Sequence, residues 1–332
     1  MKKYFAWLAS ALLIAALLPG CSASPEEAAV SEPAETEGVI SEEAGALKIP
    51  ASVTFTDALN RVLTIEPPRR IAALMGSFAD IWCLAGGADT LAAASDDAWD
   101  SFGLDLGENV TNLGSFNEVN LELLLAAEPD LVLASSSLQG HLELLDTFEQ
   151  AGISIAYFDV QVLDDYLDML DICTQLTGCV ENYELYGIQV QEQSQAALAR
   201  IVGSMPTVLC LRASGSYVRV KGSDGNVLGE MLAELGCVNV ADGDGSSLLE
   251  DLSLEAIMAA DPDYIFAVLL GGDQSKAQTN LEETLLVNPA WQSLRAVQEG
   301  HFFVLDHTLY NQKPNARWGE AYEGLVEILY SN

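Results

Sequence analysis

The chain has 332 residues, with 14 lysines and arginines against 49 aspartates and glutamates, so its formal net charge is -35. Nucleic acids are bound mainly by cationic side chains that neutralise phosphates, and this charge balance therefore excludes a nucleic-acid partner. Half of the residues are hydrophobic, which excludes a disordered chain, and the length suits about two folded lobes.

The first twenty residues are expected to be an export signal. Lys2 and Lys3 give a positive start, residues 4–18 are apolar, and a short small-residue stretch precedes Cys21, which is typical of a signal peptide. The segment also resembles a bacterial lipoprotein signal, which implies cleavage before Cys21 and a lipid on its sulfur. A plain secretory signal is the alternative. We therefore expect an extracytoplasmic protein that is anchored to the cell membrane through Cys21.

Residues 21–50 consist mainly of Ser, Glu, Ala, Pro and Gly. Such a segment cannot bury a core, so we expect a flexible acidic tether. The folded body is expected to begin near Ala51.

Helix and strand patterns alternate along the folded body. Residues 53–65 predict a β-hairpin that turns near Asn60, and 71–75 a buried strand. A helix capped by Ser77 and a strand at 91–94 follow. Asn120 then opens a short helix that stops before Pro129, and 131–134 predicts another strand. This alternation predicts an α/β fold with parallel-type sheets flanked by helices.

The helix–strand unit occurs twice. Residues 120–134 (NLELLLAAEPDLVLA) and 253–267 (SLEAIMAADPDYIFA) align without gaps and share most of their apolar positions. The duplication predicts two similar lobes, at 51–178 and 205–332, with a ligand cleft between them. Between the lobes, 179–204 is expected to form one long connecting helix, and about 23 helical residues would span roughly 35 Å.

Several short motifs together resemble a known family. They are Asn120-Leu121-Glu122, Pro129-Asp130, Glu255, Pro262-Asp263, the run from Gly236 to Val240, Pro289-Ala290-Trp291 and the run from Leu294 to Val297. The chain resembles, over about 52–330, the solute-binding lipoproteins of ABC importers for iron-siderophores, haem and cobalamin. That resemblance implies a monomer with two lobes and one connecting helix. It also implies an acidic residue on each lobe that docks the membrane permease, here Glu122 and Glu255. For either glutamate, the alternative role is that of a favourable charge at a helix N-terminus.

Candidate ligand contacts follow from the expected architecture. Ligands in such lobes bind at the carboxyl ends of the strands, and this edge nominates, besides Ser77, the residues Trp99, Phe116 and Ser136 in the first lobe and Tyr217 and Arg219 in the second. The resemblance adds Arg317, on an irregular segment that follows Tyr310. An ion pair with Glu320 is the alternative role for Arg317.

The charge distribution constrains the ligand. No lysine or arginine occurs from Ile71 to Ala199, whereas Arg212, Arg219, Lys221, Lys313 and Arg317 all lie in the second half. An anionic ligand would have to be bound there.

Other chemistry has little support in the sequence. His141, His301 and His307 have no paired metal-ligand spacing, so we expect no metal site, although His141 could be an axial ligand of haem iron. No nucleophile or phosphate-loop motif predicts a catalytic residue. Cys173 and Cys179 are close enough in sequence to form a local disulfide, and the sequence leaves this open.

The expected function is the extracytoplasmic solute-binding component of an ABC importer for an iron chelate, with a siderophore favoured over haem. A cobalamin- or corrinoid-binding importer protein is one alternative. A surface enzyme acting on a tetrapyrrole or metal chelate is an alternative of another class. No cofactor is expected, because the chelate is the cargo.

Overall fold

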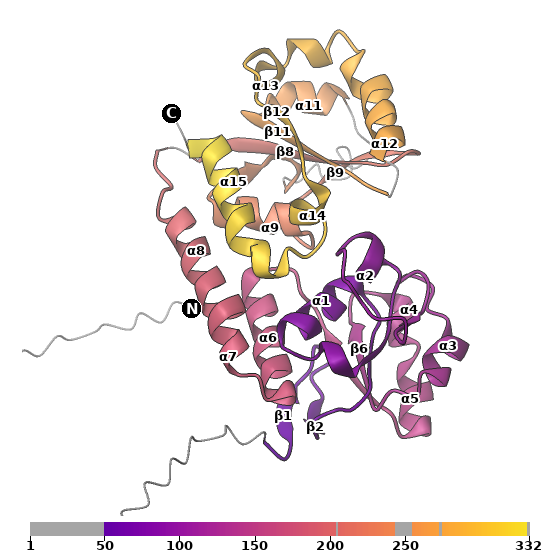
Figure 1. The fold of residues 1–332 in the computed structure, drawn as a ribbon. Coiled ribbons are helices and arrows are strands. Elements are labelled where there is room, and N and C mark those ends of the chain that lie inside the picture. The colour runs from indigo at the N-terminus through magenta and orange to yellow at the C-terminus, as the bar shows by residue number, and fades with distance from the viewer. Residues whose placement is uncertain (1–49, 204, 243–253, 272–273, 331–332) are drawn as a thin grey trace, which may run out of the picture. The chain divides into compact units, whose positions relative to one another are not determined.

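The computed structural model describes residues 50–203, 205–242, 254–271 and 274–330, and Figure 1 labels their helices and strands. The predicted hairpin is present: β1 (Val53–Thr56) pairs antiparallel with β2 (Val62–Ile65). Asn60 turns the chain with a positive φ of 59°, a conformation that asparagine tolerates better than most residues. The Asp57 carboxylate accepts hydrogen bonds from the N–H groups of Leu59 and Arg61, both at 3.0 Å, which closes the turn.

The sheet of the N-terminal lobe has five parallel strands in the order β5-β4-β3-β6-β7. The strands are β3 (Ile71–Ala73), β4 (Leu91–Ala94), β5 (Thr111–Asn112), β6 (Leu131–Ser135) and β7 (Ser154–Phe158). The three central strands, β3, β4 and β6, are buried throughout, as expected of a parallel sheet that helices cover on both faces.

The helices of this lobe lie between the strands in sequence. They are α1 (Gly76–Leu84), η1 (Ala88–Thr90), α2 (Asp97–Asp100), α3 (Leu121–Ala126), α4 (Gln139–Leu142), α5 (Leu145–Ala151) and α6 (Leu163–Thr177). The prediction that Ser77 caps the first helix is wrong, because α1 already begins at Gly76. The Gly76 N–H donates instead to the Asp97 carboxylate at 2.9 Å, so Ser77 lies inside the first turn.

The connecting segment differs from the single long helix that we expected. After Gly178, whose φ of 77° ends α6, the chain forms α7 (Glu181–Tyr183), η2 (Glu184–Ile188) and α8 (Gln189–Leu198) in direct succession. The middle stretch, η2, is a π-helix. The whole helical run extends from Glu181 to Leu198, so it spans about 27 Å at 1.5 Å per residue.

The sheet of the C-terminal lobe has the order β10-β8-β11-β12 in parallel, and β9 adds antiparallel to β8. The strands are β8 (Thr207–Ala213), β9 (Val218–Lys221), β10 (Val238–Asn239), β11 (Tyr264–Leu269) and β12 (Phe302–Leu305). β9 and β10 pair with different halves of the same β8 edge, so this sheet includes an antiparallel hairpin strand, whereas the five-stranded sheet of the first lobe is entirely parallel.

The helices of the C-terminal lobe cover both faces of this sheet (Figure 1). They are α9 (Val227–Glu234), η3 (Val240–Asp242), α11 (Leu254–Ala260), α12 (Gln274–Leu281), η4 (Glu282–Leu286), η5 (Trp291–Ser293), α13 (Arg295–Gln298), α14 (His307–Tyr310), η6 (Asn315–Arg317) and α15 (Trp318–Tyr330). Helix α15 packs on α8 so closely that a Cβ at Gly319 would lie 2.4 Å from the Gln193 side chain. Only glycine allows this approach.

The sequence repeat corresponds to a structural repeat. Glu128 and Asp261, at equivalent positions, both have positive φ angles, of 47° and 39°. The aspartates that follow have matching structural roles. Asp130 accepts hydrogen bonds from the backbone N–H groups of Arg69 and Arg70, and Asp263 accepts one from the N–H of Thr207. Each Pro-Asp pair therefore ties the end of a helix to the start of a neighbouring strand.

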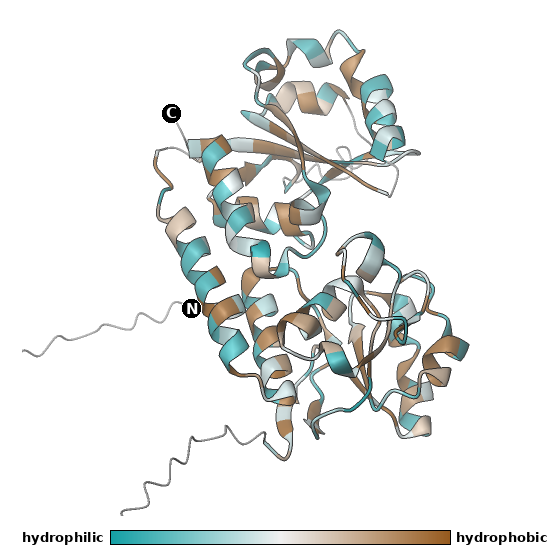
Figure 2. Ribbon diagram, viewed as in Figure 1, coloured by the Kyte–Doolittle hydropathy of each residue, from teal (hydrophilic) through white to brown (hydrophobic). Residues whose placement is uncertain are grey.

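Alternate residues along each strand enter different apolar clusters. Leu209 and Leu211 belong to an outer cluster of the C-terminal lobe, whereas Val208 and Cys210 belong to a cluster that also contains Phe78 and Trp82 of the N-terminal lobe. A third cluster covers the other face of the first sheet. Figure 2 shows the hydrophobic strands that supply these clusters. We expected one core for each lobe, but the lobes share a core, and this sharing restrains their relative motion.

The cysteines of the described residues are unpaired. Cys173 is fully buried in the shared core, whereas the Cys179 sulfur lies beside Gly86, so the disulfide that the sequence left open is absent. Among the residues that the structure describes, no helix is both long and apolar enough to cross a membrane.

Candidate ligand-binding cavity

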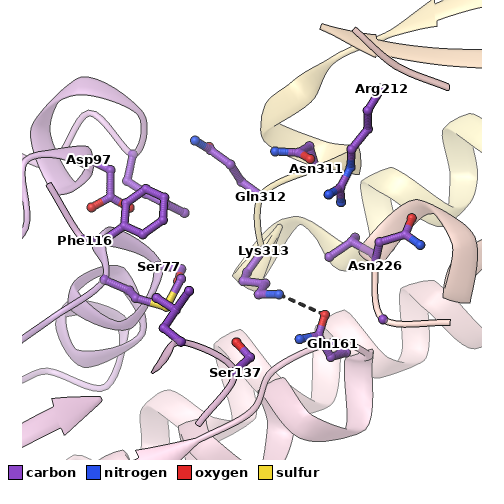
Figure 3. A pocket seen from close by; sticks show the side chains of 15 residues that line it. Ser77, Asp97, Phe116, Ser137, Gln161, Arg212, Asn226, Asn311, Gln312 and Lys313 are labelled. Carbon is purple, nitrogen blue, oxygen red and sulfur yellow. Dashed lines mark hydrogen bonds between the residues drawn. The ribbon is translucent and has the colours of Figure 1, made fainter. Parts of the chain in front are cut away.

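A cavity of about 420 Å³ lies between residues of both lobes (Figure 3). One wall comes from the N-terminal lobe and one from the C-terminal lobe, and the rest comes from residues 311–313, the first part of a strap formed by residues 311–317. The lining residues are Met75, Ser77, Asp97, Phe102, Phe116, Ser137, Leu138, Gln161, Arg212, Gly225, Asn226, Val227, Asn311, Gln312 and Lys313. The size suits a small chelate or part of a larger one.

The N-terminal wall is mostly apolar or neutral. Phe116, Phe102 and Met75 offer apolar surface. The Asp97 carboxylate is occupied by hydrogen bonds from Gly76 N–H and the Ser95 hydroxyl, and burial raises its pKa. This carboxylate therefore serves mainly to hold the start of α1 in place.

Two buried polar atoms at the cavity have no protein partner among the described residues. They are the Ser77 hydroxyl oxygen and the side-chain oxygen of Gln312. A buried polar group without a hydrogen bond is costly. A ligand that carries hydroxyl or amide groups would satisfy them.

The C-terminal wall presents a cation. Arg212 is the second-last residue of β8, opposite Val268 on one side and Arg219 on the other. Within the described residues its guanidinium has no hydrogen bond or ion pair, and burial lowers its pKa. In Figure 3 the side chain of Arg212 lies on the same side as Asn226 and Asn311. An arginine in such surroundings favours an anionic ligand.

The strap contributes a second cation. The Lys313 ammonium donates to the side-chain oxygen of Gln161 at 3.2 Å, and burial lowers the pKa of Lys313 to about 8. Asp159 and Asp165 raise that pKa and Arg212 lowers it, each by a smaller amount than burial. Lys313 is therefore charged at neutral pH and lacks a carboxylate within ion-pair distance among the described residues.

His141 cannot act as an axial ligand in this arrangement. Its side chain is fully buried. The Ser135 N–H donates to Nδ1 at 3.0 Å, and Nε2 lies 2.8 Å from the Phe116 carbonyl oxygen, which the ring N–H satisfies. Both ring nitrogens are therefore occupied, and burial lowers the pKa of the imidazole. Among the described residues, no cluster of histidine, cysteine and acidic side chains could hold a metal ion.

The predicted ligand residues are only partly brought together. Phe116 lines the cavity, and Ser136 is adjacent to the lining residue Ser137. Trp99 packs instead against the shared core. Tyr310 is buried, and its hydroxyl donates to the Ala321 carbonyl at 3.0 Å.

The remaining predicted residues lie outside the cavity lining. Arg219 stacks over the exposed ring of Tyr217 at 4.8 Å. It shares a sheet face with Arg212, since the two pair directly across β8 and β9. Arg317 forms two hydrogen bonds of 2.8 Å with Glu320, the ion pair named as its alternative role. It also borders a smaller side cavity.

Sequence reasoning did not select Arg212, Gln312 or Lys313 as contacts. The basic residues that the sequence analysis placed in the second half of the chain did include Arg212 and Lys313. Their charge was the sequence signal that pointed to a role in binding an anion. No local pattern distinguishes them from the other basic residues.

The predicted docking residues occupy equivalent positions. Glu122 is exposed in the first turn of α3, and Glu255 is exposed in the first turn of α11. The Asn120 side chain caps α3 by accepting the Leu123 N–H at 3.1 Å. Ser253, which matches Asn120, lies outside the described residues, as do the predicted lipidation residue Cys21 and residues 22–49 of the predicted tether.

Comparison with known proteins identifies relatives that are named as binding proteins. The family described as periplasmic binding protein matches residues 71–309. An uncharacterized ABC transporter substrate-binding lipoprotein of Bacillus subtilis, YvrC, is 25% identical over 99% of this chain and 98% of its own length. The Fe(3+)-citrate-binding protein YfmC of the same organism is 22% identical over 74% of this chain and 75% of its own.

A solved structure supports the fold. The periplasmic heme-binding protein RhuT from Roseiflexus sp. RS-1, in apo form, superimposes with a TM-score of 0.64 at 23% identity. The match covers 79% of this chain and 98% of that protein. The predicted α/β architecture is thereby confirmed.

Proposed function

Because the chain belongs to the periplasmic binding protein family, we propose that it is the extracytoplasmic solute-binding component of an ABC importer and that its ligand is an anionic iron chelate. The observation that supports this ligand class is Arg212, a cation that lines the cavity without a carboxylate partner among the described residues. In a protein with a net charge of -35, a cation left unneutralised at a cavity is suited to an incoming anion.

The rest of the cavity fits such a ligand. Phe116 and Met75 offer apolar surface to the organic part of a chelate, while Ser77 and Gln312 offer hydrogen-bonding atoms. The relatives that we compared are named for substrate binding, iron citrate and haem. Since His141 has no free ring nitrogen, haem would have to bind here without an axial histidine from that position.

The delivery step involves the two exposed glutamates. Glu122 and Glu255 lie in the first turns of equivalent helices and would pair with cationic side chains of a membrane permease. The docked permease would then pull the lobes apart and release the ligand, using ATP hydrolysed on the other side of the membrane, without covalent chemistry in this chain.

A thermal-shift screen tests the ligand assignment. Purified protein is heated with ferric citrate, a ferric catecholate, haem or cobalamin, and ligand at 100 times its Kd is expected to add about 2.7 kcal/mol of stability. We expect a shift with at least one anionic ferric chelate. A shift with cobalamin alone, or chemical turnover of haem, would contradict the proposal.

Binding of an anionic chelate is expected to weaken as the pH rises through about 8, the pKa to which burial lowers Lys313. The bound anion favours the charged lysine, so affinity is fully present below this pKa and decreases above it. Titrations between pH 7 and 9.5 should show a loss of roughly tenfold per pH unit at the alkaline end. Lys313→Gln should remove this pH dependence, and its persistence in that variant would contradict the assignment.

The anchor is proposed to be a lipid on Cys21. Substitution Cys21→Ala in the full-length precursor should remove the acyl chains, each of which contributes about 0.8 kcal/mol per buried CH₂ to membrane binding. Fractionation should then find the protein released from the membrane. Cys179→Ala is the control, because this cysteine lies in the folded body. Membrane retention of Cys21→Ala would exclude the lipid anchor.

A further inference from the structure

The two cavity cations are attached to different walls. Arg212 lies in strand β8, between β11 and β9 in the C-terminal sheet. Lys313 lies within the C-terminal lobe in sequence, but its side-chain hydrogen bond is with the N-terminal lobe. The Lys313 ammonium donates to Gln161, on the connection between β7 and α6. Its position in the sequence would place Lys313 on the C-terminal wall of the cavity, whereas this hydrogen bond places it on the N-terminal wall.

Asn315 fixes the strap to the N-terminal lobe. Its side-chain N–H groups donate to the Ser77 carbonyl at 2.9 Å and to the Asp80 carboxylate at 2.7 Å, both on helix α1. Asn315 is fully buried and has a φ of 52°. A strained, buried residue with two bonds to α1 holds the backbone of Lys313, two residues earlier, against the same lobe.

Gln161 is itself oriented by the N-terminal lobe. Its side-chain N–H donates to Asp159 at 2.8 Å, and its backbone N–H donates to Asp165 at 2.8 Å. The amide oxygen is therefore presented to Lys313 by groups on its own lobe. The Lys313 ammonium is held in place by hydrogen bonding rather than by a direct ion pair.

We propose that Arg212 and Lys313 form a divided cation pair, one on each wall, which selects ligands that present anionic groups to both walls, and that Asn315 is the positioning residue that keeps Lys313 on the N-terminal wall. Without a ligand the two cations repel each other across the cavity. A ligand with anionic groups on two sides binds both and joins the walls. This selectivity rests on the proposed function, because it specifies the ligand of the same cavity.

Ligand-free protein provides a test that is independent of the ligand's identity. Lys313→Gln and Arg212→Gln each remove a half-buried cation, so each variant should have a melting temperature higher by about 2–4 °C. The double variant should gain less than the sum of the two, because the mutual repulsion is lost in either single variant. Arg200→Gln, which changes an exposed arginine outside the cavity, is the matched control. Strictly additive effects, or destabilisation by both substitutions, would overturn the proposal.

Ligand selectivity provides the second test. Ferric citrate is the polyanionic probe, and an uncharged ferric trihydroxamate is its neutral counterpart. Each single variant should bind ferric citrate at least about tenfold more weakly, equivalent to about 1.4 kcal/mol, with binding of the neutral chelate changed by less than about threefold. Equal losses for both probes would contradict the pair's selective role. If wild-type protein binds neither these probes nor any chelate in the screen, the proposed function fails, while the test on ligand-free protein still decides whether the cations repel.

The role of Asn315 is tested with Asn315→Gly. Glycine adopts the positive φ without strain, so this variant removes the amide contacts to α1 while leaving the backbone relaxed. Ferric citrate affinity should fall about tenfold, with that of the trihydroxamate nearly unchanged. A purely structural role would weaken both probes equally, and that result would overturn the positioning assignment.

Discussion

Reversing both proposed docking charges, with Glu122→Arg and Glu255→Arg together, is expected to abolish ligand uptake by cells. Both side chains are exposed on first turns of equivalent helices, and like charges placed opposite permease cations cost several kcal/mol. The measurement is uptake of the radiolabelled iron chelate that the screen identifies, together with its affinity for the purified protein. Affinity should remain within about threefold, since neither residue lines the cavity.

The matched control is Glu118→Arg with Glu327→Arg. These substitutions make the same change in net charge at exposed positions, one in each lobe, and should leave uptake near the wild-type rate. Each docking substitution also loses a favourable helix-dipole interaction of about 0.3–1 kcal/mol, which is too small to unfold the protein. Normal uptake by the docking variant, or a large loss of ligand affinity, would contradict the docking role.

Truncation of the buried tryptophans is expected to have the largest effect on stability. Trp82 and Trp291 are at most 1% exposed, Trp82 in the shared core and Trp291 in the outer core of the C-terminal lobe. Replacing either by alanine should lower the free energy of unfolding by about 3–5 kcal/mol, because the lost contacts leave a cavity. Urea unfolding of the ligand-free protein measures both values.

Phenylalanine variants separate packing from hydrogen bonding. The Trp82 indole N–H donates to the Gly87 carbonyl at 2.8 Å and lies 3.0 Å from the Thr90 hydroxyl. The Trp291 N–H has no partner among the described residues. Trp82→Phe should therefore be more destabilising than Trp291→Phe by about 1 kcal/mol. A larger cost at Trp291 would mean that its N–H is satisfied by water.

The local elements were predictable because their signals are local. Asn120 caps its helix as expected, since a cap is a bond between residues three positions apart. The predicted cap of α1, Ser77, lies two residues after the observed N-cap, Met75, because Asp97, more than twenty residues later, satisfies the Gly76 N–H. The connecting helical run was shorter than expected because it begins at Glu181 and ends at Leu198, and nothing in its residues predicted the π-helical stretch at η2.

The candidate cavity was much less predictable. The strand-end rule selected Ser77 and Phe116, and both line the cavity. It did not distinguish Arg212 from Arg219, because the two residues are paired on neighbouring strands of one sheet face and differ only in what packs above them. Arg219 stacks on an exposed ring, whereas Arg212 lines the cavity.

The sequence by itself determined the charge, the repeated helix–strand unit and the α/β class, since composition and short-range periodicity carry this information. Only the tertiary structure decided which cations share a cavity. Lys313 reaches the N-terminal wall through the contacts of Asn315 with Ser77 and Asp80, residues more than two hundred positions away. Such a contact depends on how the two lobes pack on their shared core, and no local pattern records it.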